Sequence, residues 1–162
     1  MHLPIAVTVN DVEHRLEVDT RSTLASMLRG LGLTGTHIGC STGNCGACTV
    51  ILDGQTVKSC CVLAADTGGQ EILTIEALSS SADDLHPIQQ AFVAHQGLQC
   101  GFCTPGVVMS TLALLRENAD PSEAEIRHAI AGNLCRCTGY ELIVKSIAEA
   151  GKLLREQAPA PR

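Results

Sequence analysis

The sequence predicts an α+β protein in which a β-rich domain precedes a helical one. Three observations predict this. Apolar residues alternate with polar ones in the first half of the chain, whereas in the second half they recur at helical spacing. A stretch rich in Ser, Ala and Asp separates the two patterns. Eight of the nine cysteines divide evenly between the halves, so we expect domains at residues 1–76 and 87–162, with a linker at residues 77–86.

The first domain has the pattern of two β-hairpins and a further strand. Residues 5–18 alternate in hydrophobicity around an Asn10-Asp11 turn, and residues 49–57 flank an Asp-Gly turn. Residues 72–75 are the further strand. Between the hairpins, Ser22 is a suitable N-cap for a short helix that ends at Gly30. Two hairpins with one helix between them predict a β-grasp sheet.

The second domain has the pattern of four helices. Pro87 begins a segment that ends at Gly97, and Thr104 is expected to cap the next helix, with Pro105 at its first position. Two more helices are predicted after these, one behind a capping box formed by Ser122 and Glu125, and one along residues 143–154. Four short helices predict a bundle.

The first cysteine set has the spacing of an iron-sulfur site. C-x4-C-x2-C followed by a distant fourth cysteine is typical of plant-type 2Fe-2S centres, whereas zinc knuckles favour two C-x-x-C pairs. Glycines stand between the cysteines, which suits a backbone that wraps closely around a cluster. The predicted ligands are Cys40, Cys45, Cys48 and Cys60.

The second cysteine set is less specific by spacing alone. It joins a C-x2-C pair to a distant C-x-C pair, a pattern that suits either 2Fe-2S or tetrahedral zinc. Both pairs precede predicted helices, whose positive ends stabilise thiolates. Cys61 is left over and is expected to be a small buried apolar residue, with exchange for Cys60 as a ligand as the alternative. The members of the second set are Cys100, Cys103, Cys135 and Cys137.

Composition excludes several classes of function. The formal net charge is −6, and the basic residues are scattered, so neither nucleic acid nor an anionic membrane is an expected partner. No signal peptide or membrane-spanning stretch is present, which predicts a cytoplasmic protein whose thiols stay reduced. We find no catalytic triad, phosphate loop or paired carboxylates, and therefore expect no catalytic residues on this chain.

Three sequence strings resemble the small iron-sulfur subunit of molybdenum hydroxylases, the xanthine oxidase family. They are residues 39–50, residues 99–106 and residues 132–140, and the likeness extends over almost the whole chain. As a separate small chain, the protein is similar to the corresponding subunits of aerobic carbon monoxide dehydrogenase and quinoline oxidoreductase. This resemblance implies a plant-type ferredoxin-like domain followed by a four-helix domain. It also implies that the second cysteine set binds 2Fe-2S.

The resemblance further implies partners and cofactors. A large subunit would hold molybdopterin, in its cytosine dinucleotide form, and a medium subunit would hold FAD, in a dimer of heterotrimers. Gln99 would bond to the pterin, and Cys137 would be the ligand nearest to it. Electrons would pass from molybdenum to the second cysteine set, then to the first, and then to flavin.

The predicted function is therefore that of an electron-transfer subunit of an oxidoreductase, with the substrate site on another chain. The substrate would be an N-heteroaromatic compound or a small molecule such as carbon monoxide. Two alternatives stay open at this point. One is a freestanding two-cluster ferredoxin that serves soluble partners, and the other is a zinc-stabilised interaction module.

Overall fold

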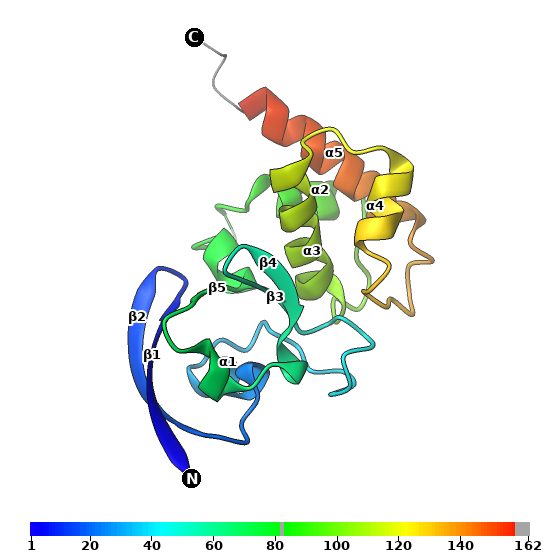
Figure 1. The fold of residues 1–162 in the computed structure, drawn as a ribbon. Helices are drawn as coiled ribbons and strands as arrows, with labels where there is room; N and C mark the ends of the chain where they lie inside the picture. The colour runs from blue at the N-terminus through cyan, green and yellow to red at the C-terminus, as the bar shows by residue number, and fades with distance from the viewer. Residues whose placement is uncertain (82, 158–162) are drawn as a thin grey trace.

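The computed structural model describes residues 1–81 and 83–157 and has an α+β architecture (Figure 1). A sheet and one helix occupy the N-terminal end, and the remaining helices lie toward the C-terminal end. The strands are β1 (His2–Val9), β2 (Val12–Asp19), β3 (Thr49–Leu52), β4 (Gln55–Lys58) and β5 (Glu71–Leu73). The helices are α1 (Leu24–Gly30), α2 (Pro87–Ala94), α3 (Thr104–Glu117), α4 (Glu123–Ala129) and α5 (Glu141–Gln157). Short 3-10 turns cover Ser59–Cys61, Ala64–Thr67 and Ile75–Leu78.

Both predicted hairpins are confirmed, together with their turns. Asn10 and Asp11 have φ values of 50° and 64°, and Asp53 and Gly54 have φ values of 46° and 82°. Positive φ at both central residues matches the right-handed twist of the flanking strands. The four hairpin strands and β5 form one mixed sheet in the order β2-β1-β5-β3-β4, in which only the β1 and β5 pair is parallel.

Strand β3 is buried on both faces, and this position links the two halves of the chain. Val50 packs with the core formed by α1 and the sheet, whereas Ile51 packs with the core formed by α2 to α5. Successive side chains of a strand point to opposite faces, so one strand can serve two cores. As a result, the first cysteine loop, which leads directly into β3, is held against the helices.

The predicted N-cap of the first helix was wrong by one residue. Thr23, not Ser22, caps α1, and its side-chain oxygen accepts a hydrogen bond from the amide of Ser26. Ser22 is instead part of the preceding turn, where its amide donates to the carbonyl of Asp19 and its own carbonyl accepts from Ala64. Ser22 and Thr23 both carry hydroxyl groups suited to an N-cap, and Thr23 takes this position because the preceding turn includes Ser22.

The predicted strand at residues 72–75 was too long at its C-terminal end. Strand β5 ends at Leu73 because Thr74 bonds to a side chain instead of a neighbouring strand. The Thr74 amide donates to Asn10 Oδ1 at 2.9 Å, and Asn10 Nδ2 donates to Thr74 Oγ1 at 2.9 Å. The chain then makes a 3-10 turn over Ile75–Leu78.

Four helices lie within residues 87–157, as predicted, although several boundaries differ, and α5 extends over Glu141–Gln157 instead of residues 143–154. Helix α2 ends at Ala94, before Gly97, and α3 starts at Thr104, so that Pro105 is its second residue. Thr104 was therefore wrongly predicted as a cap, and Cys103 stands at the N-cap without a capping bond from its side chain. The capping box of Ser122 and Glu125 is confirmed at α4.

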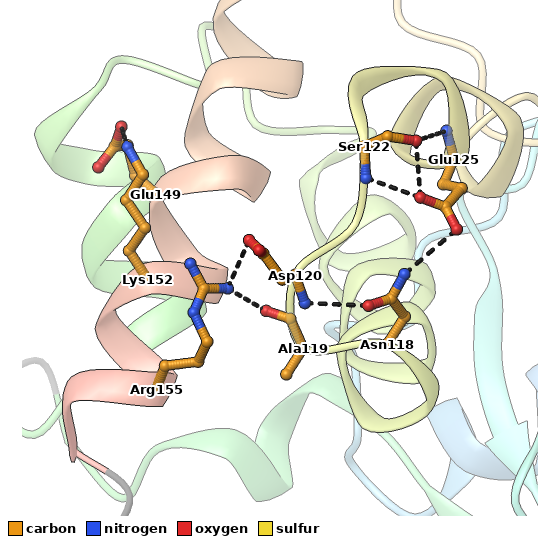
Figure 2. A network of polar contacts seen from close by, with 8 residues as sticks. All are labelled: Asn118, Ala119, Asp120, Ser122, Glu125, Glu149, Lys152 and Arg155. Atoms are coloured by element: carbon orange, nitrogen blue, oxygen red, sulfur yellow. Dashed lines mark hydrogen bonds and ion pairs between the residues drawn. The ribbon is translucent and has the colours of Figure 1, made fainter.

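A polar network fastens the turn between α3 and α4 to α5 (Figure 2). Arg155 donates to the carbonyl of Ala119 and forms an ion pair with Asp120 at 3.0 Å. On the other side of the turn, Asn118 donates to Glu125 at 3.2 Å. These contacts close the end of the helical half that lies away from the sheet.

No helix within residues 1–81 and 83–157 is both long enough and apolar enough to cross a membrane. The end of the predicted second domain, residues 158–162, lies outside the described part of the chain, as does residue 82 of the predicted linker.

Candidate iron-sulfur sites

The first cysteine set is brought together by the loop between α1 and β3 and by the turn that follows β4. Cys48 is buried directly before β3, and Cys60, in the 3-10 turn after β4, packs against it and Ala25. The amide of Cys45 donates to Cys40 Sγ at 3.4 Å. Pairing of β3 with β4 places the fourth cysteine beside the other three, because Thr49 is opposite Lys58 in the register.

The thiols of the first set differ in their ease of deprotonation. Hydrogen bonds from Thr42, followed by the amide of Cys45, lower the pKa of Cys40 to about 6. Burial raises the pKa of Cys48 and that of Cys60. Because a metal binds the thiolate form, ligation at the two buried positions must release protons. The half-exposed Cys40 is the member already poised for binding.

The second set lies at the start of α3 and in the loop before α5. Cys137 Sγ lies 3.6 Å from Cys100 Sγ, and both residues are exposed. Cys103 is buried, and its thiol neighbours that of Cys135. Burial, together with that neighbour, raises the pKa of Cys103 to about 12.

The pKa of Cys135 is shifted in the opposite direction to that of Cys103, and several polar groups hydrogen-bond to this residue. Burial alone would raise the pKa of Cys135, but hydrogen bonds from Thr138 and Cys137 outweigh it, so the pKa is lowered. Thr138 Oγ1 donates to the sulfur of Cys135 at 3.2 Å, and the amide of Cys135 donates to Tyr140 Oη at 2.8 Å. Tyr140 thus fixes the backbone on which this thiol sits.

The residues of each set suit a two-iron centre with four thiolate ligands. Two thiolates bound at about 2.3 Å to one tetrahedral metal lie roughly 3.8 Å apart, close to the 3.6 Å between the Cys100 and Cys137 sulfurs. Three thiol pairs are formed, between Cys48 and Cys60, between Cys100 and Cys137, and between Cys103 and Cys135. A 2Fe-2S centre needs two thiolates for each iron.

A further observation favours a bound group at the second set. Thr104 Oγ1, directly after Cys103, is buried and has no hydrogen-bond partner within the described residues. A buried hydroxyl without a partner is costly. Sulfur atoms of an iron-sulfur centre accept hydrogen bonds of this kind.

Cys61 was wrongly predicted to be buried. It is exposed, and its sulfur lies 3.7 Å from that of Cys60. The prediction assumed a strand, in which neighbouring side chains point to opposite faces. The two cysteines instead lie in a 3-10 turn, which leaves both sulfurs near the loop at Gly43.

The two cysteine loops contact each other directly through the backbone. The amide of Leu134 donates to the carbonyl of Cys45 at 2.8 Å. Asn133, beside it, is buried and donates through Nδ2 to the carbonyl of Gly46 at 2.9 Å. Its Oδ1 accepts from Ser110 Oγ at 2.8 Å.

Sequence reasoning missed Asn133 and also Lys58. Lys58 is half-buried, and burial lowers its pKa, while the thiols of the first set act in the opposite direction. Neither residue has a spacing that distinguishes it from an ordinary polar residue. Their only signal was their position, two residues before the predicted ligands Cys135 and Cys60.

Gln99, the predicted pterin contact, is exposed next to Cys100 and lies at the same surface as the exposed thiols. A second contact joins the two loops near this surface. The His37 and Phe102 rings stack with centroids 4.9 Å apart, and His37 Nδ1 lies 2.8 Å from the carbonyl of Phe102.

The fold and the two sets of paired thiols define a protein with two iron-sulfur sites, and comparison with known proteins agrees. A model for a 2Fe-2S iron-sulfur cluster binding domain matches residues 7–79, and a model for a second 2Fe-2S binding domain matches residues 74–148. The chain is 49% identical to the nicotine 6-hydroxylase small subunit of Paenarthrobacter nicotinovorans, over 90% of this chain and 88% of that one. It is 42% identical to the xanthine dehydrogenase iron-sulfur-binding subunit of Escherichia coli O157:H7, over 93% and 95% of the two chains.

A solved structure gives the same result. Quinoline 2-oxidoreductase from Pseudomonas putida 86 matches with a TM-score of 0.91 and 42% identity, over 96% of this chain and 98% of that one. The chain belongs to the family of small iron-sulfur subunits of molybdenum hydroxylases. It is accordingly an electron-transfer component of an oxidoreductase.

Proposed function

We propose that this chain carries electrons away from a molybdenum site through two 2Fe-2S centres held by its two cysteine sets. Cys40, Cys45, Cys48 and Cys60 would bind the first centre, and Cys100, Cys103, Cys135 and Cys137 the second. The observation that carries the proposal is the gathering of the eight cysteines into two groups, each with contacts among its own members, in one compact unit. A 2Fe-2S centre, when bound, supplies reversible one-electron transfer.

The chain's own residues would connect the two centres and insulate them. Leu134 and Cys135 are adjacent in sequence, so the bond from the Leu134 amide to the Cys45 carbonyl joins a ligand of one set to the neighbour of a ligand of the other. Cys48, Cys60 and Cys103 are buried, which excludes water from one side of each site. Cys100 and Cys137 are exposed, which leaves the second site open toward a partner.

We propose that the partner at the second site is a large subunit that holds molybdopterin as its cytosine dinucleotide. Gln99 and Cys137 would make the contact, since both are exposed. In the aldehyde oxidoreductase of Megalodesulfovibrio gigas, 43% identical, the matching region is only 17% of the chain. In that protein, the unit therefore works beside much larger parts of the same polypeptide.

The assembly would also contain a medium FAD-binding subunit that accepts electrons from the first site, arranged as a dimer of heterotrimers. Relatives of similar identity bear names that refer to nicotine, caffeine and aldehydes. Because such different compounds go with such similar small subunits, substrate choice would lie on the large subunit. We place the complex in the cytoplasm, where thiols remain reduced and available as ligands.

At the level of domains, we propose that residues 1–76 form a β-grasp, ferredoxin-like domain and residues 87–162 a four-helix domain, with residues 77–86 as linker. The hairpin pairings and the helix order are consistent with this division. Ile51, which packs into the helical core, would make the two domains one structural unit.

Elemental analysis of anaerobically purified protein tests the proposal. We expect about four iron atoms and four acid-labile sulfides per chain, with two distinct EPR signals after reduction. Zinc without sulfide would overturn it in favour of a structural module. Co-purification with a molybdenum-containing large chain is expected, and purification of a fully loaded monomer from its native host would instead favour a freestanding ferredoxin.

A further inference from the structure

The side chain of Lys58 lies beside the first cysteine set. This residue ends β4 and stands two residues before Cys60. Its ammonium group donates to Thr49 Oγ1 at 2.9 Å, and Thr49 directly follows Cys48. The side chain is thus folded back over the loop and does not extend into solvent.

The ammonium group of Lys58 has no carboxylate partner. None of the ion pairs within residues 1–81 and 83–157 includes it, although the side chain is half-buried. A partly desolvated charge is unfavourable unless an opposite charge lies close by. The groups near the Lys58 ammonium that become anionic when a metal binds are those of the first cysteine set, since its partner Thr49 follows Cys48 and Lys58 itself stands two residues before Cys60.

The same ammonium group also faces the loop that leads to the second set. A Cβ atom built on Gly132 would lie 3.3 Å from Lys58 Nζ, with no other contact within 4 Å apart from the Lys58 side chain. Thr49 Oγ1, which accepts the Lys58 bond, also accepts from Asn133 at 3.3 Å. Lys58 is therefore placed between the two loops, nearer to the ligands of the first.

We propose that Lys58 is the counter-charge of the first iron-sulfur centre and raises its reduction potential, which favours electron flow from the second site to the first. This inference rests on the proposed function. Reduction adds one negative charge to the centre, and a nearby positive charge stabilises the reduced form more than the oxidised form. Lys58 would act on the centre through its charge, without being a ligand of the iron.

The test is a redox titration of the assembled complex, with each EPR signal followed separately. Lys58→Gln removes the charge but keeps a hydrogen-bond donor for Thr49, and Lys58→Arg keeps the charge. We expect Lys58→Gln to shift the midpoint of the first-set signal to lower potential and to move the second less, while Lys58→Arg leaves both close to the parent. An unchanged first-set midpoint in Lys58→Gln would overturn the inference.

A second pair of variants covers the case in which Lys58→Gln fails to assemble its first centre. Gly132→Asp would place a carboxylate beside the ammonium group and neutralise it, whereas Gly132→Asn adds the same volume without charge. A lower first-set potential in Gly132→Asp than in Gly132→Asn supports the inference, and equal potentials contradict it. Iron and sulfide content distinguishes failure of this inference from failure of the proposed function, because a parent protein without these elements would refute the proposed function itself.

Discussion

The amide of Leu134 donates to the carbonyl oxygen of Cys45 at 2.8 Å, so that one hydrogen bond joins two loops whose residues are 89 positions apart. Each loop carries cysteines of a different set. The bond fixes the two candidate sites relative to each other through rigid backbone. Substitutions of the residues around this contact can therefore measure how much it stabilises the chain.

Asn133→Ala should destabilise the chain by about 3 kcal/mol. The substitution leaves the buried Ser110 hydroxyl without its acceptor and removes one donor to the Gly46 carbonyl, which keeps its bonds from Thr49. Urea unfolding of the cluster-loaded chain, followed by circular dichroism, gives the value. Asn118→Ala, which removes two exposed bonds at the α3–α4 turn, is the control and should cost under about 1 kcal/mol. An equal loss of unfolding free energy in the two variants would show that the buried hydrogen bonds of Asn133 stabilise the chain no more than the exposed ones of Asn118.

Gly106→Ala should destabilise the chain by about 3 kcal/mol or more. A Cβ at this position would lie 2.1 Å from the carbonyl oxygen of Gly46, and backbone on both sides leaves no flexible atom to move away. Gly30→Ala is the matched control, because nothing lies within 4 Å of its Cβ and the residue ends helix α1. We expect that control to be neutral or slightly stabilising. A tolerated Gly106→Ala would mean that helix α3 and the first cysteine loop are not in close contact.

Cys137→Ser should remove or alter the second centre while the first persists. Its sulfur pairs with that of Cys100, away from the first set. EPR of the reduced variant should show one of the two parental signals unchanged. Cys61→Ser serves as the control and should keep both signals, since eight other thiols complete the sets. Loss of both signals in Cys137→Ser would argue against independent sites.

Cys40 should be the thiol whose reactivity changes near neutral pH in metal-free protein. Its pKa is lowered to about 6, so the thiolate predominates above that value and protonates as the pH falls through it. Alkylation with iodoacetamide from about pH 5 to 9, read by mass spectrometry, should give a rate that levels off above about pH 7. Cys103, with a pKa raised to about 12 and a buried sulfur, should stay unlabelled over the same range. A Cys40 midpoint near the ordinary thiol value of about 8.5 would contradict the hydrogen bonding described here.

The division of the cysteines into two sets and the element order could be predicted from the sequence because both depend on local spacing. The C-x4-C-x2-C pattern and its distant fourth cysteine identified one set, and the alternation of residues 5–18 identified a hairpin. Apart from the burial of Cys61, the wrong predictions concerned the ends of elements. Thr23 replaced Ser22 as a cap and β5 stopped at Leu73, because hydrogen bonds to residues distant in sequence decided these boundaries.

By itself, the sequence determined which thiols are available, how they divide into two sets, and that a β-rich half precedes a helical half. Only the tertiary structure decided how the sets lie toward each other. Asn133 and Lys58 look like ordinary polar residues until the fold buries the first against Gly46 and turns the second toward Thr49. The physical reason is that the value of a polar or charged group depends on its burial and on its partners, and both are set by packing between segments far apart in the chain.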